Sequence, residues 1–274
     1  MSSSTFDFKR PRRNLILAAV AAILAVNAVI LFAPDVDSRN YYGNITGPLT
    51  AAVAAAFSII VVERQKLSGI FGRTYAALAI GLALWLIAEG LWTYYTIGLQ
   101  VEAPFPSLAD VFWLAGYGPL GYHLFATARF YGRVKKHTTV IVSVAAAIFA
   151  AAYVNSIIDS SMLSGENSYI PLAITIIYPI LDAVMVIPVV LILVNPVRGQ
   201  LTSIPWIFIS WIFTTSADAM FGQTVVANLA AEVTIWNLLY NAAYICMAAG
   251  LYWYNRYFIF DEKKLTVAWQ RAHR

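Results

Sequence analysis

The sequence has little cysteine and little charge. Its 274 residues include one cysteine, Cys246, so no internal disulfide and no cysteine-rich metal site can form. Charged residues make up only 12%, against about 25% in an average soluble domain. Hydrophobic residues make up 60%, and the mean hydropathy is +0.69. This composition excludes an ordinary soluble domain and predicts an integral membrane protein.

Apolar runs long enough to cross a bilayer recur along the whole chain. Because backbone polar groups find no water in the lipid interior, each run is expected to be helical. The sequence therefore predicts an all-α, polytopic integral membrane bundle of eight transmembrane helices. It forms a single domain over 1–260, followed by a short cytoplasmic tail over 261–274. The predicted spans are 14–33, 43–62, 74–98, 109–129, 138–158, 169–194, 204–225 and 233–257.

The basic residues are distributed very unevenly between the two sides of this predicted bundle. Seventeen of the eighteen Lys and Arg residues fall on the side of the termini, and only Arg39 falls on the other side. By the positive-inside rule, this asymmetry predicts a multi-pass protein of the cell membrane with both termini in the cytoplasm. The basic loops can also contact anionic membrane lipids. No basic stripe or recognition motif accompanies the charge, so no nucleic-acid partner is predicted.

Four acidic residues, by contrast, lie within the predicted spans, where no Lys or Arg stands at a similar depth. An ionisable group inside a membrane helix costs about 2.5–3.5 kcal/mol on insertion and usually faces the bundle interior. These acids are Glu89, Asp110, Asp182 and Asp218. In the predicted topology they lie between the outer surface and the midplane. Either some are protonated, or water, a cation or a ligand reaches them.

Aromatic residues accompany these acids at helical spacing. This pattern predicts an outward-facing acidic and aromatic cavity for a small amphipathic or cationic ligand. An alternative is that the aromatic residues form interfacial belts while the acids make hydrogen bonds between helices. The predicted ligand-binding residues are Glu89, Trp92, Asp110, Trp113, Tyr117, Asp182, Asp218, Trp236, Asn237, Tyr240 and Asn241.

No cofactor or metal is assigned. His123 is the single histidine within a predicted span, and a haem site would normally need a second axial ligand at matching depth.

The two halves of the sequence show a faint internal duplication. Trp113 and Tyr117 are echoed 123 residues later by Trp236 and Tyr240. Each pair opens an inward-running helix and follows an outward-running helix that carries an acid. This pattern predicts a 4+4 tandem repeat, with a pseudo-twofold axis along the membrane normal.

Several segments carry a family resemblance: "AEGLW", "PSLADVFWLAGYGPL", "YPILDAVM", "SADAMFG" and "WNLLYNAAYICMAAGL". They resemble the multi-spanning N-terminal sensory membrane region of bacterial and some archaeal signalling proteins, marked by a Pro-Ser-x-Ala-Asp motif. In those proteins a GGDEF cyclase or a kinase typically follows, whereas no such output sequence follows residue 260 here. The resemblance implies a sensory or ligand-binding module that acts through a protein signalling partner.

Two alternative functions remain open. Asp110 with His123, and Ser216 with Asp218, are similar to the pattern of lysoplasmalogenase-type membrane hydrolases. That likeness implies an intramembrane ether-lipid hydrolase in which Asp110 and Asp218 activate water. A cation-coupled small-molecule transporter would also use intramembrane acids, although the apolar inner halves of the spans disfavour it. The sequence favours a function other than catalysis without excluding an enzyme.

Overall fold

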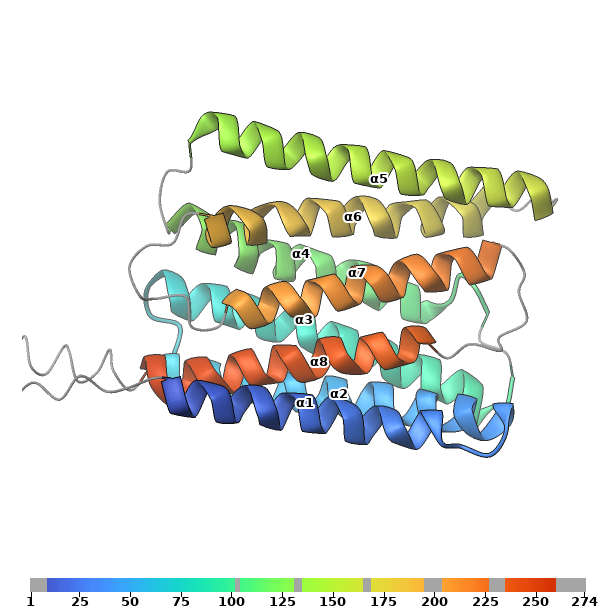
Figure 1. Cartoon of the computed structure of the whole chain (residues 1–274), viewed down its shortest axis with the longest axis horizontal. Coiled ribbons are helices and arrows are strands. Elements are labelled where there is room, and N and C mark those ends of the chain that lie inside the picture. Colours follow the sequence, from blue (N-terminus) through green and yellow to red (C-terminus); the bar gives the residue numbers. More distant parts are fainter. Residues whose placement is uncertain are drawn as a thin grey trace, which may run out of the picture.

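The described residues form a bundle of eight α-helices whose axes lie roughly along one line, with alternating chain direction (Figure 1). The computed structural model describes residues 9–101, 104–130, 135–164, 169–194, 204–226 and 235–259. The predicted tail, 261–274, lies outside these residues. The helices are α1 (Lys9–Leu31), α2 (Val36–Gln65), α3 (Gly69–Thr93), α4 (Leu108–Phe130), α5 (Lys136–Ser164), α6 (Tyr169–Val194), α7 (Ile204–Val226) and α8 (Ile235–Trp253). Two π-helical turns, η1 (Tyr94–Gly98) and η2 (Tyr254–Phe258), extend α3 and α8.

The predicted all-α class and the eight helices are confirmed. Five helices are long and apolar enough to cross a membrane, which makes this a multi-pass membrane protein. These five spans are Arg12–Leu31, Val36–Gln65, Gly69–Gly98, Lys136–Asp159 and Tyr169–Val194. Helices α4, α7 and α8 are less apolar and lie outside this set.

Helix α2 begins at Val36, seven residues before its predicted span. Asp35 causes the early start, because its carboxylate accepts a hydrogen bond of 2.7 Å from the backbone N–H of Ser38. This is an N-cap, which satisfies a backbone donor that the first helical turn leaves open. The same bond holds the pKa of Asp35 below its usual value.

The helices form two facing layers with one helix at each end (Figure 1). Helix α3 packs between α2 and α4, and α7 packs between α6 and α8. The layers are joined where α2 packs against α8 and where α4 packs against α6. At the ends, α1 lies against α8 and α2, while α5 lies against α6 and α7. In each layer, therefore, three consecutive helices pack side by side in chain order.

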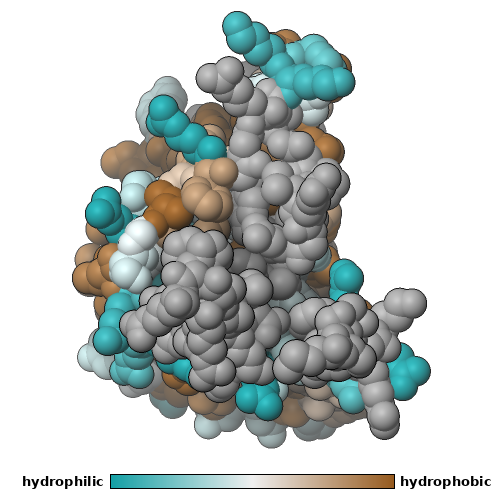
Figure 2. Space-filling view, turned by 90° about the vertical axis from the view of Figure 1, so that its left-hand side faces the viewer, coloured by the Kyte–Doolittle hydropathy of each residue, from teal (hydrophilic) through white to brown (hydrophobic). Residues whose placement is uncertain are grey.

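The outer surface of the bundle is apolar. Helix α5 leaves Ile141, Ile148 and Phe149 more than half exposed, as suits side chains that contact lipid acyl chains. Figure 2 looks at the end where α1 begins and α8 ends, and it shows hydrophilic side chains around the edge of that end. The exposed basic residues Arg73 and Arg129 belong to this end. This distribution of apolar sides and a polar end matches a protein embedded in a bilayer.

Helices α3 and α4 approach each other closely at two glycines. A Cβ atom added at Gly81 would lie 2.5 Å from Leu120, and one added at Gly116 would lie 2.5 Å from the indole of Trp85. Small residues of this kind let membrane helices pack backbone to backbone. The contact also fixes Trp85, whose indole N–H donates to the carbonyl of Trp113 at 3.0 Å.

Candidate functional site

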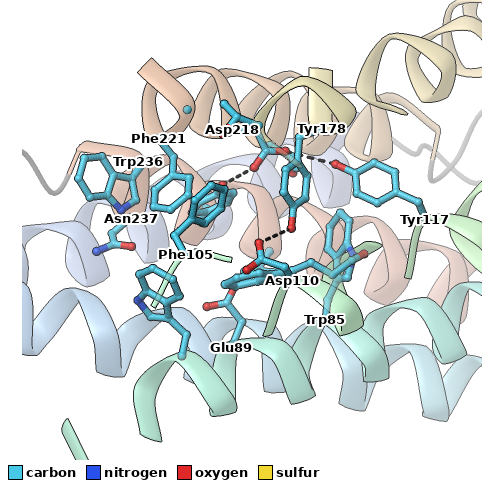
Figure 3. A pocket seen from close by; sticks show the side chains of 17 residues that line it. Trp85, Glu89, Phe105, Asp110, Tyr117, Tyr178, Asp218, Phe221, Trp236 and Asn237 are labelled. Carbon is cyan, nitrogen blue, oxygen red and sulfur yellow. Dashed lines mark hydrogen bonds between the residues drawn. The ribbon is translucent and has the colours of Figure 1, made fainter. Parts of the chain in front are cut away.

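A cavity lies among α3, α4, α6, α7 and α8, toward the end of the bundle opposite the start of α1 (Figures 1 and 3). Its cavity volume is about 70 Å³. Figure 3 shows Glu89, Asp110 and Asp218 reaching it from three different helices.

Nine of the eleven predicted site residues line this cavity. They are Glu89, Trp92, Asp110, Trp113, Tyr117, Asp218, Trp236, Asn237 and Tyr240. Asp182 and Asn241 do not line it. The sequence therefore located the cavity walls, although no finding tests whether these residues bind a ligand.

Several residues that line the cavity were not among the predicted ligand-binding residues. The helical spacing of most of them nevertheless indicated that they share a face with an acid or with a predicted residue. Tyr178 lies four residues before Asp182, and Phe221 lies three residues after Asp218, so each shares a helix face with an acid. Trp85 and Tyr244 continue stripes that include Glu89 and Tyr240. Phe105 had no periodic signal, because it lies in the segment before α4.

Each of the four intramembrane acids accepts a hydrogen bond from a tyrosine on another helix. Tyr178 donates to Asp110 at 2.9 Å, and Tyr244 donates to Glu89 at 2.9 Å. Tyr240 donates to Asp218. These bonds replace the water that a carboxyl group loses inside a membrane protein.

Asp110 also holds the start of α4. Its Oδ2 accepts the backbone N–H of Ser107 at 2.7 Å, and the Ser107 hydroxyl accepts the backbone N–H of Ala109 at 3.1 Å. This is a capping-box arrangement, in which the cap residue and a residue of the first turn satisfy each other's open donors. The Pro-Ser-x-Ala-Asp motif thus has a local structural role, while the other oxygen of Asp110 turns to Tyr178.

Asp182 lies directly behind the cavity wall. The Tyr117 hydroxyl is 2.7 Å from Asp182 and 3.3 Å from Asp218. A hydroxyl carries a single proton and cannot donate to both groups. Asp182 is only 1% exposed, and its Oδ2 has no partner among the described residues, so the single proton of Tyr117 leaves one of its two carboxyl contacts without a donor.

Aromatic rings surround the cavity at its outer end and at its inner end. We call Trp92, Phe105, Phe221 and Trp236 the aromatic rim: Phe221 meets each of the other three at a centroid distance of 5.8 Å. We call Trp85, Tyr117, Trp211 and Tyr244 the aromatic floor: Trp85 meets the other three at 5.7, 5.8 and 6.3 Å. The carboxyl groups lie between rim and floor.

Asn241 has a different position from the one predicted. It is fully buried and connects α8 to α1 and α2. Its amide nitrogen donates to Asn27 at 3.2 Å and Thr46 at 2.9 Å, and its oxygen accepts from Thr50 at 3.1 Å. These bonds use its polar atoms on the side of α8 away from the cavity, so Asn241 is a packing residue. Asn237, one turn earlier, does line the cavity.

His123 does not join the acids. It lies on the same unbroken helix as Asp110, thirteen residues further on, which corresponds to about 20 Å along the axis. Its Nδ1 is 3.0 Å from the carbonyl of Thr74, and its ring contacts Tyr75. No group of three or more His, Cys, Asp and Glu residues that could hold a metal occurs in the described part of the chain.

The cavity has an acidic lining. Three carboxyl groups line it, and no Lys, Arg or His is among the described lining residues. The structure thus defines a class: a multi-pass helical membrane protein with an acidic cavity walled by aromatic rings. Comparison with protein families, with curated proteins and with solved structures gave no match.

Proposed function

We propose that the protein is a membrane sensory module that binds a small amphipathic or cationic ligand from the outer side and acts through a signalling partner. The observation that carries this proposal is the cavity itself. Five helices contribute to it, and nine residues selected from sequence alone line it. Interfacial belts facing lipid would not converge in this way.

The outward orientation rests on the basic residues. The end where α1 begins carries the exposed Arg73, Arg129 and Lys136, and the cavity lies toward the opposite end. By the positive-inside rule, we assign the basic end and both termini to the cytoplasm. With all eight helices spanning the membrane, a ligand then reaches the cavity from outside the cell.

The architecture supports a 4+4 tandem repeat. The contacts of α2 with α3 and α8 are matched by those of α6 with α7 and α4. Hydrogen bonds also join the two halves: Tyr244 of the second half donates to Glu89 of the first, and Tyr117 of the first half lies beside Asp218 of the second. A ligand between the halves would contact both and bias how they pack, which is how binding could reach the inner end.

The closed inner side favours a sensor over a transporter. Below the aromatic floor, α3 and α4 pack the buried Leu78, Leu82, Leu120 and Leu124. A transported ion or polar solute would need a polar path there, and these side chains offer none. The hydrolase alternative loses support because His123 lies far along α4 from Asp110.

The test is a thermal-stability screen of the purified full chain in lipid nanodiscs against a library of small metabolites. A ligand at free concentration L that binds the folded state stabilises it by RT ln(1 + L/Kd), so the melting temperature rises with the logarithm of the ligand concentration. We expect such a compound to stabilise the wild type and the Asp37→Asn variant, whose exposed acid lies outside the cavity. Stabilisation should be lost in Glu89→Gln and Asp218→Asn. Compounds that stabilise all four proteins equally would contradict a cavity site.

Transmission is tested by distance measurement. In a Cys246→Ser background, spin labels at Glu63→Cys and Lys135→Cys report on the inner end of the two halves. We expect the distance distribution between the labels to shift when a compound from the screen binds. An unchanged distribution at saturating compound would count against signalling through this end.

A further inference from the structure

We propose that the ligand of this cavity is an organic ammonium ion, a positively charged nitrogen attached to an apolar body. This inference rests on the proposed function and names the chemical class that the site takes. It follows from the charge of the lining residues, from the rings around them and from the separation of the carboxyl groups.

The charge balance favours a cation. Glu89, Asp110 and Asp218 line the cavity, and their hydrogen-bond donors are neutral tyrosine hydroxyls and Ser107. Neutral donors stabilise a carboxylate without cancelling its charge. Behind them, Asp182 keeps one buried oxygen without a partner among the described residues. An anionic ligand would find no basic partner among the described lining residues.

The rings favour an organic cation. The aromatic rim surrounds the outer part of the cavity, and its members meet edge to face at Phe221. The negative faces of such rings attract ammonium groups, most strongly when the ring is tryptophan. The rim supplies two tryptophans, Trp92 and Trp236, and Trp113 lies next to Trp92 at 5.8 Å.

The carboxyl groups are not arranged as metal ligands. A calcium ion takes about 6–8 oxygen ligands at about 2.3–2.6 Å. In the described residues no three acidic, His or Cys groups come close enough to form such a set. The carboxyl groups come from separate helices, each with its own tyrosine donor, and carbon-rich walls lie between them (Figure 3). A larger cation with an apolar body fits these walls.

Glu89 is the best-placed counter-ion. One oxygen of Asp110 caps α4, and the other accepts a hydrogen bond from Tyr178. Both oxygens of Asp218 face tyrosine hydroxyls. Glu89 accepts from Tyr244 through one oxygen. It lies one turn from Trp92 and points into the cavity in Figure 3. Its substitution by Gln keeps an acceptor for Tyr244 and removes only the charge.

The experiment uses three probes with one body and three charges: phenethylammonium, 2-phenylethanol and phenylacetate. Binding to the full chain in phosphatidylcholine nanodiscs is measured by titration calorimetry. We expect phenethylammonium to bind about tenfold or more tightly than either other probe, a ratio expected of a partly desolvated cation–π and carboxylate contact. Glu89→Gln and Trp236→Leu should each weaken it about tenfold, Trp236→Phe less, and Asp37→Asn not at all.

The outcomes separate the two proposals. If 2-phenylethanol or phenylacetate binds as tightly as the ammonium probe, and cavity variants weaken that binding, the cavity is a ligand site and the ammonium inference is wrong. Ammonium binding that Glu89→Gln and Trp236→Leu leave unchanged also overturns it. So does a failure of phenethylammonium to bind when the library screen finds a cavity-dependent neutral or anionic ligand. Melting curves of every variant confirm folding, and Trp236→Leu decides the matter if Glu89→Gln does not fold.

Discussion

Pairing of tyrosine with carboxyl groups determines how this chain keeps four acids inside a membrane bundle. Each tyrosine places its ring against apolar neighbours and its hydroxyl on an acid of another helix. The pairing gives the acids hydrogen-bond donors without adding a basic side chain to the cavity. Asp110 combines this pairing with capping of α4, which explains a carboxyl group in the first turn of an apolar helix.

Ser107→Ala should destabilise the protein by about 0.5–2 kcal/mol, because the start of α4 loses its side-chain cap. The matched control is Ser68→Ala: Ser68 is the N-cap residue of α3, but its side chain makes no cap hydrogen bond. Equilibrium unfolding of the two variants in mixed micelles with increasing SDS measures the difference. Equal stabilities would show that the Ser107 cap contributes nothing.

Tyr117→Phe should cost about 1–3 kcal/mol, because it leaves a buried carboxyl group without its donor. The bond that is lost joins Tyr117 to Asp182, whose side chain is 1% exposed. Tyr122→Phe, at a half-exposed tyrosine of the same helix, is the control and should unfold like the wild type. The same SDS titration checks both. A neutral effect of Tyr117→Phe would mean that Asp182 finds another donor.

At the scale of elements, the crossing of α3 and α4 positions the site. Gly81 and Gly116 let the two backbones approach, and Trp85 fills the space that the missing side chain of Gly116 leaves. Trp85 then forms the centre of the aromatic floor. The geometry of the cavity therefore depends on a helix contact in which Gly81 and Gly116, which do not line the cavity, position Trp85, which does.

Gly116→Ala should destabilise the protein by about 1–3 kcal/mol through overpacking against Trp85. It should also weaken any ligand found by the screen, since Trp85 must move. Gly118→Ala, two residues further on, meets nothing within 4 Å and should be neutral or slightly stabilising. Tryptophan fluorescence and thermal unfolding compare the two. A wild-type melting temperature for Gly116→Ala would contradict the close packing of this crossing.

At the scale of the whole molecule, the proposed orientation in the membrane depends on two positions: the basic residues lie at one end of the bundle, and the cavity lies toward the other. Acids collect near one end because tertiary packing shields them there, and basic residues collect at the other because they resist translocation. The contacts of Tyr244 with Glu89 and of Tyr117 with Asp218 join the first four helices to the last four. A single ligand could thus contact helices from both halves.

The orientation predicts which cysteines an impermeant reagent can reach. In a Cys246→Ser background, Asp37→Cys lies in the first turn of α2, and Lys136→Cys lies at the start of α5. Both native residues are exposed. A membrane-impermeant maleimide applied to intact cells should label the first and not the second. The reverse pattern would invert the topology and place the cavity mouth toward the cytoplasm.

The existence of the eight helices followed from the sequence, because lipid forces every apolar run to satisfy its own backbone. The helix ends were less predictable: α2 begins seven residues early because of the local cap at Asp35. Most of the cavity also followed from the sequence, since acids beside aromatic rings at helical spacing share a face. The sequence did not reveal the position of the Asn241 side chain. Asn241 lies one turn after Asn237, but its amide turns toward Asn27, Thr46 and Thr50.

The sequence by itself determined that this chain is helical and membrane-embedded, because composition and helical period act locally and need no partner. Only the tertiary structure decided which tyrosine meets which acid, which polar groups face the cavity and which join helices. Those choices depend on the relative rotation of neighbouring helices, and that rotation is set by contacts such as Gly116 with Trp85 between residues far apart in the chain.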